Sequence, residues 1–180
     1  MEWLNQVTDL IDKYGAGAAN TAHESADADF EKFSRHAPPQ ALSEGLADAF
    51  RSSQTPPFAA MLSRLFGGSP ASQKSSVLNS LISALGPAIA AQLFASHGAP
   101  RAAQELQQGQ TVLSPEVAEQ VPAGSIEAVA HEAEKKDPSI VDRISALYAQ
   151  QPALVKTLGG LALTVAMAKI AQRQSRPSRQ

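Results

Sequence analysis

Residues 137–168, DPSIVDRISALYAQQPALVKTLGGLALTVAMA, have the pattern of two amphipathic helices joined by a Gln-Gln-Pro corner. Apolar residues recur at helical spacing on both sides of the corner, and Pro152 stands where the second helix would begin. We therefore expect a helical hairpin, with a second helix that runs without interruption over residues 152–172.

A related stretch lies 82 residues earlier, at residues 55–86, with the sequence TPPFAAMLSRLFGGSPASQKSSVLNSLISALG. Aligned without a gap, the two stretches share eight identities in 32 positions. The identical pairs are Pro56–Pro138, Ser63–Ser145, Leu65–Leu147, Pro70–Pro152, Ala71–Ala153, Lys74–Lys156, Leu81–Leu163 and Ala84–Ala166. This predicts a degenerate internal duplication of a Pro-capped helical hairpin. The alternative is that any two Pro-capped amphipathic hairpins resemble each other to this degree.

Prolines and glycines divide the rest of the chain into short helical segments. Thr55, Ser69 and Ser114 each precede a proline, a pattern typical of a helix cap followed by the first turn. We predict an all-α bundle of about seven to nine short helices. Its predicted parts are an N-terminal helix pair at residues 1–36, a first copy at 37–98, a linker at 99–113, a second copy at 114–172 and a basic flexible tail at 173–180.

Composition restricts the function further. A hydrophobic fraction of 43% and a charged fraction of 18% suit a globular chain, and the lack of cysteine excludes disulfides and thiolate chemistry. The first 50 residues carry nine acids and three bases, so we expect no nucleic-acid binding. The N-terminal segment carries Glu2, Asp9 and Asp12, unlike a signal peptide, and no uncharged apolar run reaches the roughly 18–20 residues of a membrane span. We expect a cytoplasmic protein.

The second copy resembles a known family. Residues 113–160, LSPEVAEQVPAGSIEAVAHEAEKKDPSIVDRISALYAQQPALVKTLGG, are similar to the YidB-like group of uncharacterised small helical bacterial proteins. The similarity covers about a quarter of the chain and consists mostly of helix-start residues and apolar spacing. It implies an all-helical fold and a bacterial cytoplasmic setting, and it brings no catalytic residues with it.

Sequence motifs for catalysis are incomplete. His131-Glu132 begins a zinc-protease pattern, but the second histidine is replaced by Lys135. Ser125 lacks the second glycine of a nucleophile elbow, and neither double glycine, at 67–68 or at 159–160, has the form of a phosphate-binding loop. We therefore predict a protein that is not an enzyme and has no cofactor.

Metal binding is also not predicted. His23 and Asp27 are four residues apart and could form half of a metal site with Asp29 or Glu31, although a solvated acidic helix face explains the same residues. His36 and His97 lie near expected helix C-termini, where an imidazole complements the helix dipole.

Two stripes are candidate interaction surfaces. Gly159 and Gly160 would each cost about 0.5–1 kcal/mol inside a helix. Gly160, Thr164 and Ala168 form a stripe of small residues that allows another helix to approach closely, either from the same chain or from a partner. The second stripe is apolar and includes Trp3, Leu4, Val7 and Ile11. We predict a helical protein-interaction or assembly module whose partner is another protein or a second copy.

The alternative is a peripheral membrane or lipid-binding protein. The C-terminal helix is apolar nearly all round and runs into Lys169, Arg173, Arg176 and Arg179. Such a segment could lie on an anionic bilayer, but a central core helix has the same composition. An apolar ligand held between the two hairpins is a further alternative.

Overall fold

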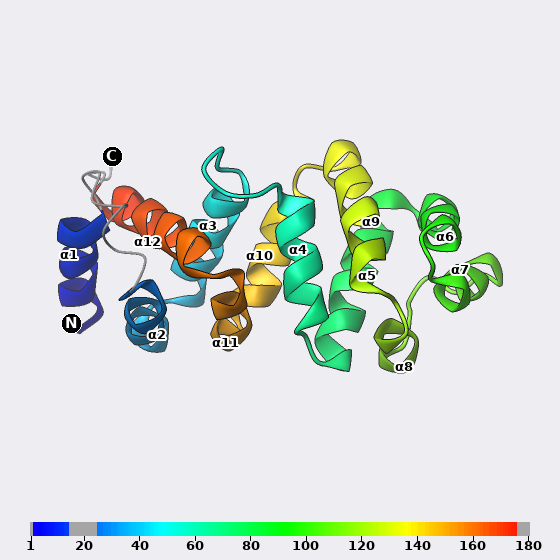
Figure 1. Cartoon of the computed structure of the whole chain (residues 1–180), viewed down its shortest axis with the longest axis horizontal. Coiled ribbons are helices and arrows are strands. Elements are labelled where there is room, and N and C mark those ends of the chain that lie inside the picture. Colours follow the sequence, from blue (N-terminus) through cyan, green and yellow to red (C-terminus); the bar gives the residue numbers. More distant parts are fainter. Residues whose placement is uncertain (1, 15–24, 176–180) are drawn as a thin grey trace. The chain divides into compact units, whose positions relative to one another are not determined.

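The computed structural model describes residues 2–14 and 25–175, except for the side chains of residues 2–4, 7, 10 and 175 (Figure 1). Within these ranges the chain forms twelve α-helices and no β-strand, so the all-α prediction is confirmed. The predicted number of helices was too low, because proline and glycine divide the chain into helices as short as α8 and α11. The helices are α1 (Glu2–Tyr14), α2 (Ala26–His36), α3 (Pro39–Phe50), α4 (Phe58–Gly67), α5 (Ala71–Leu85), α6 (Pro87–Ser96), α7 (Pro100–Gln107), α8 (Pro115–Glu119), α9 (Ala123–Lys136), α10 (Ile140–Ala149), α11 (Pro152–Val155) and α12 (Gly160–Ser175), with the 3-10 turn η3 (Lys156–Leu158) before α12.

The chain forms two compact units, which cut across the predicted boundaries. Unit 1 combines Met1–Pro56 with Tyr148–Gln180, and unit 2 is the continuous segment Pro57–Leu147. Each predicted copy is therefore divided between the units. The segment predicted as a linker, residues 99–113, contains α7, which packs against α6.

Unit 1 is organised around α12, which packs against α1, α2 and α3. Its apolar residues meet the aromatic and aliphatic side chains of α2 and α3, and most of them are fully buried, as expected for a helix that is hydrophobic on all sides. The core of unit 1 includes Phe30, Phe33, Leu42, Leu46, Phe50, Leu163, Val165, Ala166, Met167 and Ile170.

Unit 2 is built on α4, α5 and α9. α4 and α5 both pack on α9, α6 packs on α5 and α9, and α8 packs on α5, while α7 packs on α6 and α8. Figure 1 shows α6 and α7 at one edge of this unit, beyond α5 and α9. The loop before α8 is fixed to α5 because Ser75 Oγ donates to Leu113 O at 2.8 Å and Leu113 N donates to Asn79 Oδ1 at 2.9 Å.

Two of the three predicted helix caps are wrong. Thr55 Oγ1 donates to Ala49 O at 2.5 Å and so closes the end of α3, whereas α4 begins three residues later. Ser69 Oγ donates back to Leu65 O at 2.7 Å, and its side chain does not cap α5. Ser114 does cap α8, since its Oγ accepts from Val117 N at 3.4 Å. Serine and threonine hydroxyls can serve the preceding helix as easily as the following one.

The predicted uninterrupted helix over residues 152–172 is also wrong. Gly159 has φ +91°, and the chain turns by 119° between Pro152–Leu158 and Gly160–Gln174. A positive φ is accessible to glycine at little cost, so Gly159 forms a corner between η3 and α12. The equivalent stretch of the first copy is the continuous helix α5, although α4 and α10 begin and end at positions exactly 82 residues apart. The internal duplication stays a prediction.

Candidate functional site

The predicted small-residue stripe lies on the central helix of unit 1. Thr164 is fully buried, and its hydroxyl donates to Gly160 O at 2.7 Å. Gly160 and Ala168 are half-buried, while Leu161 beside them is 48% exposed. The middle of the stripe therefore packs inside the chain, and Leu161 is the large apolar side chain of α12 that faces solvent.

The second predicted stripe is described only in part. The side chains of Trp3, Leu4 and Val7 lie outside the described part of the structure, and Ile11 is half-buried. The helix that carries them, α1, packs against α12 and α2. At least one side of α1 is therefore used within unit 1.

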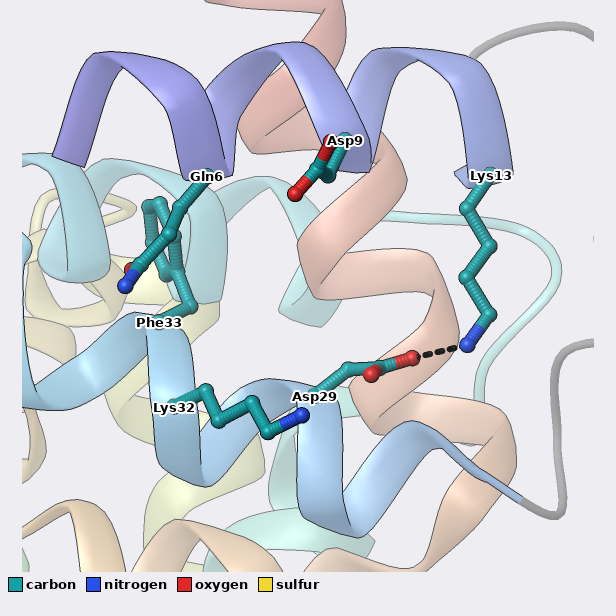
Figure 2. Close-up of a pocket in the computed structure, with 6 residues that line it drawn as sticks. All are labelled: Gln6, Asp9, Lys13, Asp29, Lys32 and Phe33. Carbon is teal, nitrogen blue, oxygen red and sulfur yellow. Dashed lines mark hydrogen bonds and ion pairs between the residues drawn. The ribbon is translucent and has the colours of Figure 1, made fainter. Parts of the chain in front are cut away.

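A polar cleft of about 120 Å³ lies between α1 and α2 (Figure 2). Its lining residues are Gln6, Asp9, Lys13, Asp29, Lys32 and Phe33. Asp29 Oδ2 accepts from Lys13 Nζ at 2.5 Å and from Tyr14 Oη at 2.7 Å. These two bonds connect the end of α1 to α2 across a segment that the structure does not describe.

The buried phenol and the carboxylate affect each other's protonation. Burial raises the pKa of Tyr14 well above its ordinary value, and the neighbouring Asp29 carboxylate raises it further. Burial alone would also raise the pKa of Asp29, but the hydrogen bonds from Lys13 and Tyr14 outweigh that effect and lower it. At neutral pH this cleft therefore holds a protonated phenol on an ionised carboxylate, an arrangement that joins two helices.

The rest of the cleft carries isolated polar groups. Gln6 Nε2 lies 3.2 Å from His36 Nδ1, while Gln6 Oε1 is buried without a hydrogen-bond partner. The side chains of Asp9 and Lys32 are exposed at its rim. No group of three or more metal-ligating side chains occurs in the described ranges, and His23, the proposed half-site partner of Asp27, lies outside them.

The basic end of α12 contacts α3. Arg173 Nε and Nη2 donate to Asp48 Oδ2 and Oδ1 at 2.5 and 2.9 Å, and Arg173 Nη1 donates to Glu44 Oε2 at 3.3 Å. Lys169 lies one turn earlier and is half-buried. Arg176 and Arg179, the other two residues of the predicted membrane contact, lie outside the described residues.

An uncharged surface covers α6 in unit 2. No Asp, Glu, Lys or Arg occurs between Lys74 and Arg101. Ile89 is 42% exposed, and the side chains next to it on the helix are small or neutral. The exposed and half-exposed residues, here called the α6 face, are Ala88, Ile89, Gln92, Leu93, Ala95 and Ser96.

Sequence reasoning missed each of these three surfaces. The partners of Asp29 and of Arg173 are 15 and 125 residues away in the chain, and no local pattern indicates either pairing. The α6 face had a visible signal in the long stretch without ionised residues between Lys74 and Arg101.

No family model, curated protein or solved structure matches this chain. The resemblance of residues 113–160 to the YidB-like group therefore stays a prediction. Any function must be argued from the surfaces themselves.

Proposed function

We propose that this protein is a non-catalytic helical assembly module that binds a second copy of itself through the α6 face. The observation that carries the proposal is the exposed α6 face itself, with Ile89 42% exposed at its centre and no ionised side chain along it. The cores of protein interfaces are depleted of charged residues in the same way.

The surfaces of α9, α3 and α12 differ from this face. α9 exposes Glu127, Lys135 and Lys136, and α3 and α12 are joined by the Arg173 ion pairs on their surface. Single exposed apolar residues need no explanation, but here the exposed apolar side chain stands on a surface without charge. The α6 face can therefore be dehydrated without removing water from an ion.

A second copy is the occupant that fits these properties best. In a two-fold symmetric dimer each subunit presents the same patch to the other, so the patch must be compatible with itself. A charged patch would repel its own copy, whereas the α6 face would not. Small residues such as Ala88, Ala95 and Ser96 would also allow two α6 helices to approach closely.

The test is sedimentation velocity of the whole chain and of Ile89→Arg. We expect wild type to associate as its concentration rises and Ile89→Arg to stay monomeric, because the interface would then bury two unpaired guanidinium groups. Val112→Arg is the matched control, since Val112 is 62% exposed and lies in a loop outside the α6 face. A wild-type chain that stays monomeric, or a Val112→Arg variant as defective as Ile89→Arg, would contradict the proposal.

Leu161→Arg tests the competing surface on α12. If the small-residue stripe beginning at Gly160 were the interface, this substitution beside it would abolish association while Ile89→Arg would not. Because Thr164 is buried inside unit 1, we expect Leu161→Arg to associate like wild type.

Contact with a membrane surface is supported less. No single helix in the described ranges is long and apolar enough to cross a bilayer, and two bent helix pairs meet the length and composition criteria only when taken together. The apolar side chains of α12 that would enter a bilayer are mostly buried in unit 1. The basic end of the helix, at Lys169 and Arg173, is the part that remains on the surface.

A further inference from the structure

The polar cleft between α1 and α2 is fastened at both ends. At one end Lys13 Nζ donates to Asp29 Oδ2 at 2.5 Å, and at the other end Gln6 Nε2 lies 3.2 Å from His36 Nδ1. The start of α1 therefore meets the end of α2, and the two helices run antiparallel across the cleft. Asp9 stands on α1 between the two fastened ends.

Asp9 and Lys32 are the two charged side chains of the cleft that stay unpaired. Lys32 stands between the fastened ends on α2, one turn after Asp29. In the described part of the chain, neither the Asp9 carboxylate nor the Lys32 ammonium makes a hydrogen bond or an ion pair. Figure 2 shows the Asp9 carboxylate reaching from α1 toward α2 without a bond to Lys32. A hollow of about 120 Å³ thus remains where an ion pair could have closed the cleft.

The charges around the cleft disfavour most simple ligands. The lining carries two carboxylates and two ammonium groups, so its net charge is zero. A metal cation would be repelled by both lysines, and an anion would be repelled by both aspartates. An apolar ligand would find Phe33 as the apolar side chain of the lining, and Phe33 is only 1% exposed. The ligand that matches this lining is neutral overall and carries one charge of each sign.

We propose that the cleft binds a free α-amino acid with a small side chain. The ammonium group of the ligand donates to the Asp9 carboxylate, and the carboxylate of the ligand accepts from the Lys32 ammonium. On the same wall as Asp9, Gln6 Oε1 is an acceptor without a hydrogen-bond partner. An ammonium group has three donors and can serve both acceptors.

The size of the hollow and its lining limit the ligand further. A hollow of about 120 Å³ is smaller than the pockets that hold drug-sized molecules. Because Phe33 is almost fully buried, the cleft offers little apolar surface to a large side chain. The cleft belongs to unit 1 and the α6 face to unit 2, so amino-acid binding does not depend on the proposed assembly.

The experiment titrates the isotope-labelled whole chain with L-alanine and follows the backbone amide shifts by NMR. Propionate and ethylamine are the matched probes, since each keeps one of the two charged groups of alanine. We expect alanine to shift amides of α1 and α2. Each probe forgoes one charge-assisted hydrogen bond and should bind about tenfold more weakly or worse.

Two variants test the two contacts separately. Asp9→Asn and Lys32→Gln should each weaken alanine binding about tenfold or more. Asp12→Asn is the matched control, because it removes the same charge as Asp9→Asn from an exposed residue of α1 that does not line the cleft. Circular dichroism verifies that the three variants keep the wild-type helical content.

The site is supported if alanine binds better than both probes and if Asp9→Asn and Lys32→Gln lose affinity while Asp12→Asn does not. It is overturned if wild type does not respond to alanine, or if propionate or ethylamine binds as well as alanine. It is equally overturned if Asp9→Asn and Lys32→Gln bind alanine like wild type. Equal losses in Asp9→Asn and Asp12→Asn would also overturn it, since the effect would then follow net charge alone.

Discussion

Asp29 bonds α2 to the C-terminal end of α1 through its side chain. Its Oδ2 accepts from both Lys13 and Tyr14, and Tyr14 is 2% exposed. A buried hydroxyl that donates to a carboxylate contributes more than a neutral hydrogen bond, because the acceptor is charged. The pair therefore helps to hold α1 on α2.

Tyr14→Phe should lower the free energy of unfolding by about 1.5–3 kcal/mol at neutral pH, the typical range for a hydrogen bond to a charged group. Folding raises the pKa of Tyr14. The stabilising effect of the Tyr14 hydroxyl is therefore complete below the unfolded-state pKa of about 10, and it is lost as pH rises toward the folded-state pKa. The free energies of unfolding of wild type and variant, measured with denaturant, should thus begin to converge above about pH 10. A stability difference that stays constant up to strongly alkaline pH would contradict this assignment.

The stability that Asp29 contributes depends on pH in the opposite direction. The folded-state pKa of Asp29 is lowered, so its contribution is present above the unfolded-state pKa of about 3.9 and is lost as pH falls through the folded-state value. Asp29→Asn should therefore destabilise the protein at neutral pH and change its stability little in strong acid. Urea unfolding at both pH values checks this, and equal destabilisation at both would contradict it.

At the scale of elements, α3 and α12 pack closely at Gly45. A Cβ atom at this position would lie 2.2 Å from Ile170 Cγ1 and 3.2 Å from Ala166 O. Gly45 is buried, so a larger residue there could be accommodated only if α12 moved. Glycine allows this contact, although it is less favourable than alanine inside a helix.

Gly45→Ala should therefore destabilise the protein by about 1–3 kcal/mol, as overpacking does, despite the better helix propensity of alanine. The control is Gly124→Ala on α9, where an added Cβ would meet nothing within 4 Å. That variant should be neutral or stabilised by up to about 1 kcal/mol. Thermal unfolding of the two variants distinguishes them, and equal effects would show that α3 and α12 are not in close contact.

The corner at Gly159 leads to a second prediction about stability. Gly159→Ala should cost about 1–2 kcal/mol because φ is +91°, although a Cβ there would meet nothing within 4 Å. Gly67→Ala at the end of α4 is the control, since its Cβ would be in ordinary contact with Ala123 at 3.7 Å. If Gly159→Ala instead stabilises the protein, the helix continues through residue 159 as the sequence pattern suggested.

These elements show what could be predicted from the sequence. The start of α8 after Ser114 followed from local cap chemistry, and the helical periodicity of α4 and α10 was plain. Thr55 and Gly159 were misinterpreted because a hydroxyl can bond to either neighbouring helix, and a glycine can either continue a helix or end it. The close contact at Gly45 could not be predicted, since it depends on a residue 125 positions away.

At the scale of the whole molecule, the chain is divided differently from its sequence pattern. α3 belongs to the first predicted copy and α12 to the second, yet they pack on each other in unit 1. Hydrophobic periodicity identifies which face of a helix is buried but does not identify the helix that covers it. The partners of Asp29 and of Arg173 were missed for the same reason, because the pattern of one helix does not identify the residues that it meets on another helix.

Unit 2 should be able to fold without unit 1. Its residues, Pro57–Leu147, form one continuous segment with their own buried core, which includes Phe58, Leu62, Phe66, Leu78, Phe94 and Ile126. We expect this segment, expressed alone, to be helical by circular dichroism and to unfold cooperatively in urea. An isolated segment with the spectrum of an unfolded chain would show that the two units depend on each other for folding.

The most direct test of the proposed assembly is hydrogen exchange of the whole chain at low and high protein concentration. We expect the backbone amides of Pro87–Ser96 to exchange more slowly as concentration rises, because the partner covers the α6 face. Amides of Gly160–Ser175 should not change. Protection that rises in α12 but not in α6, or in neither helix, would contradict assembly through the α6 face.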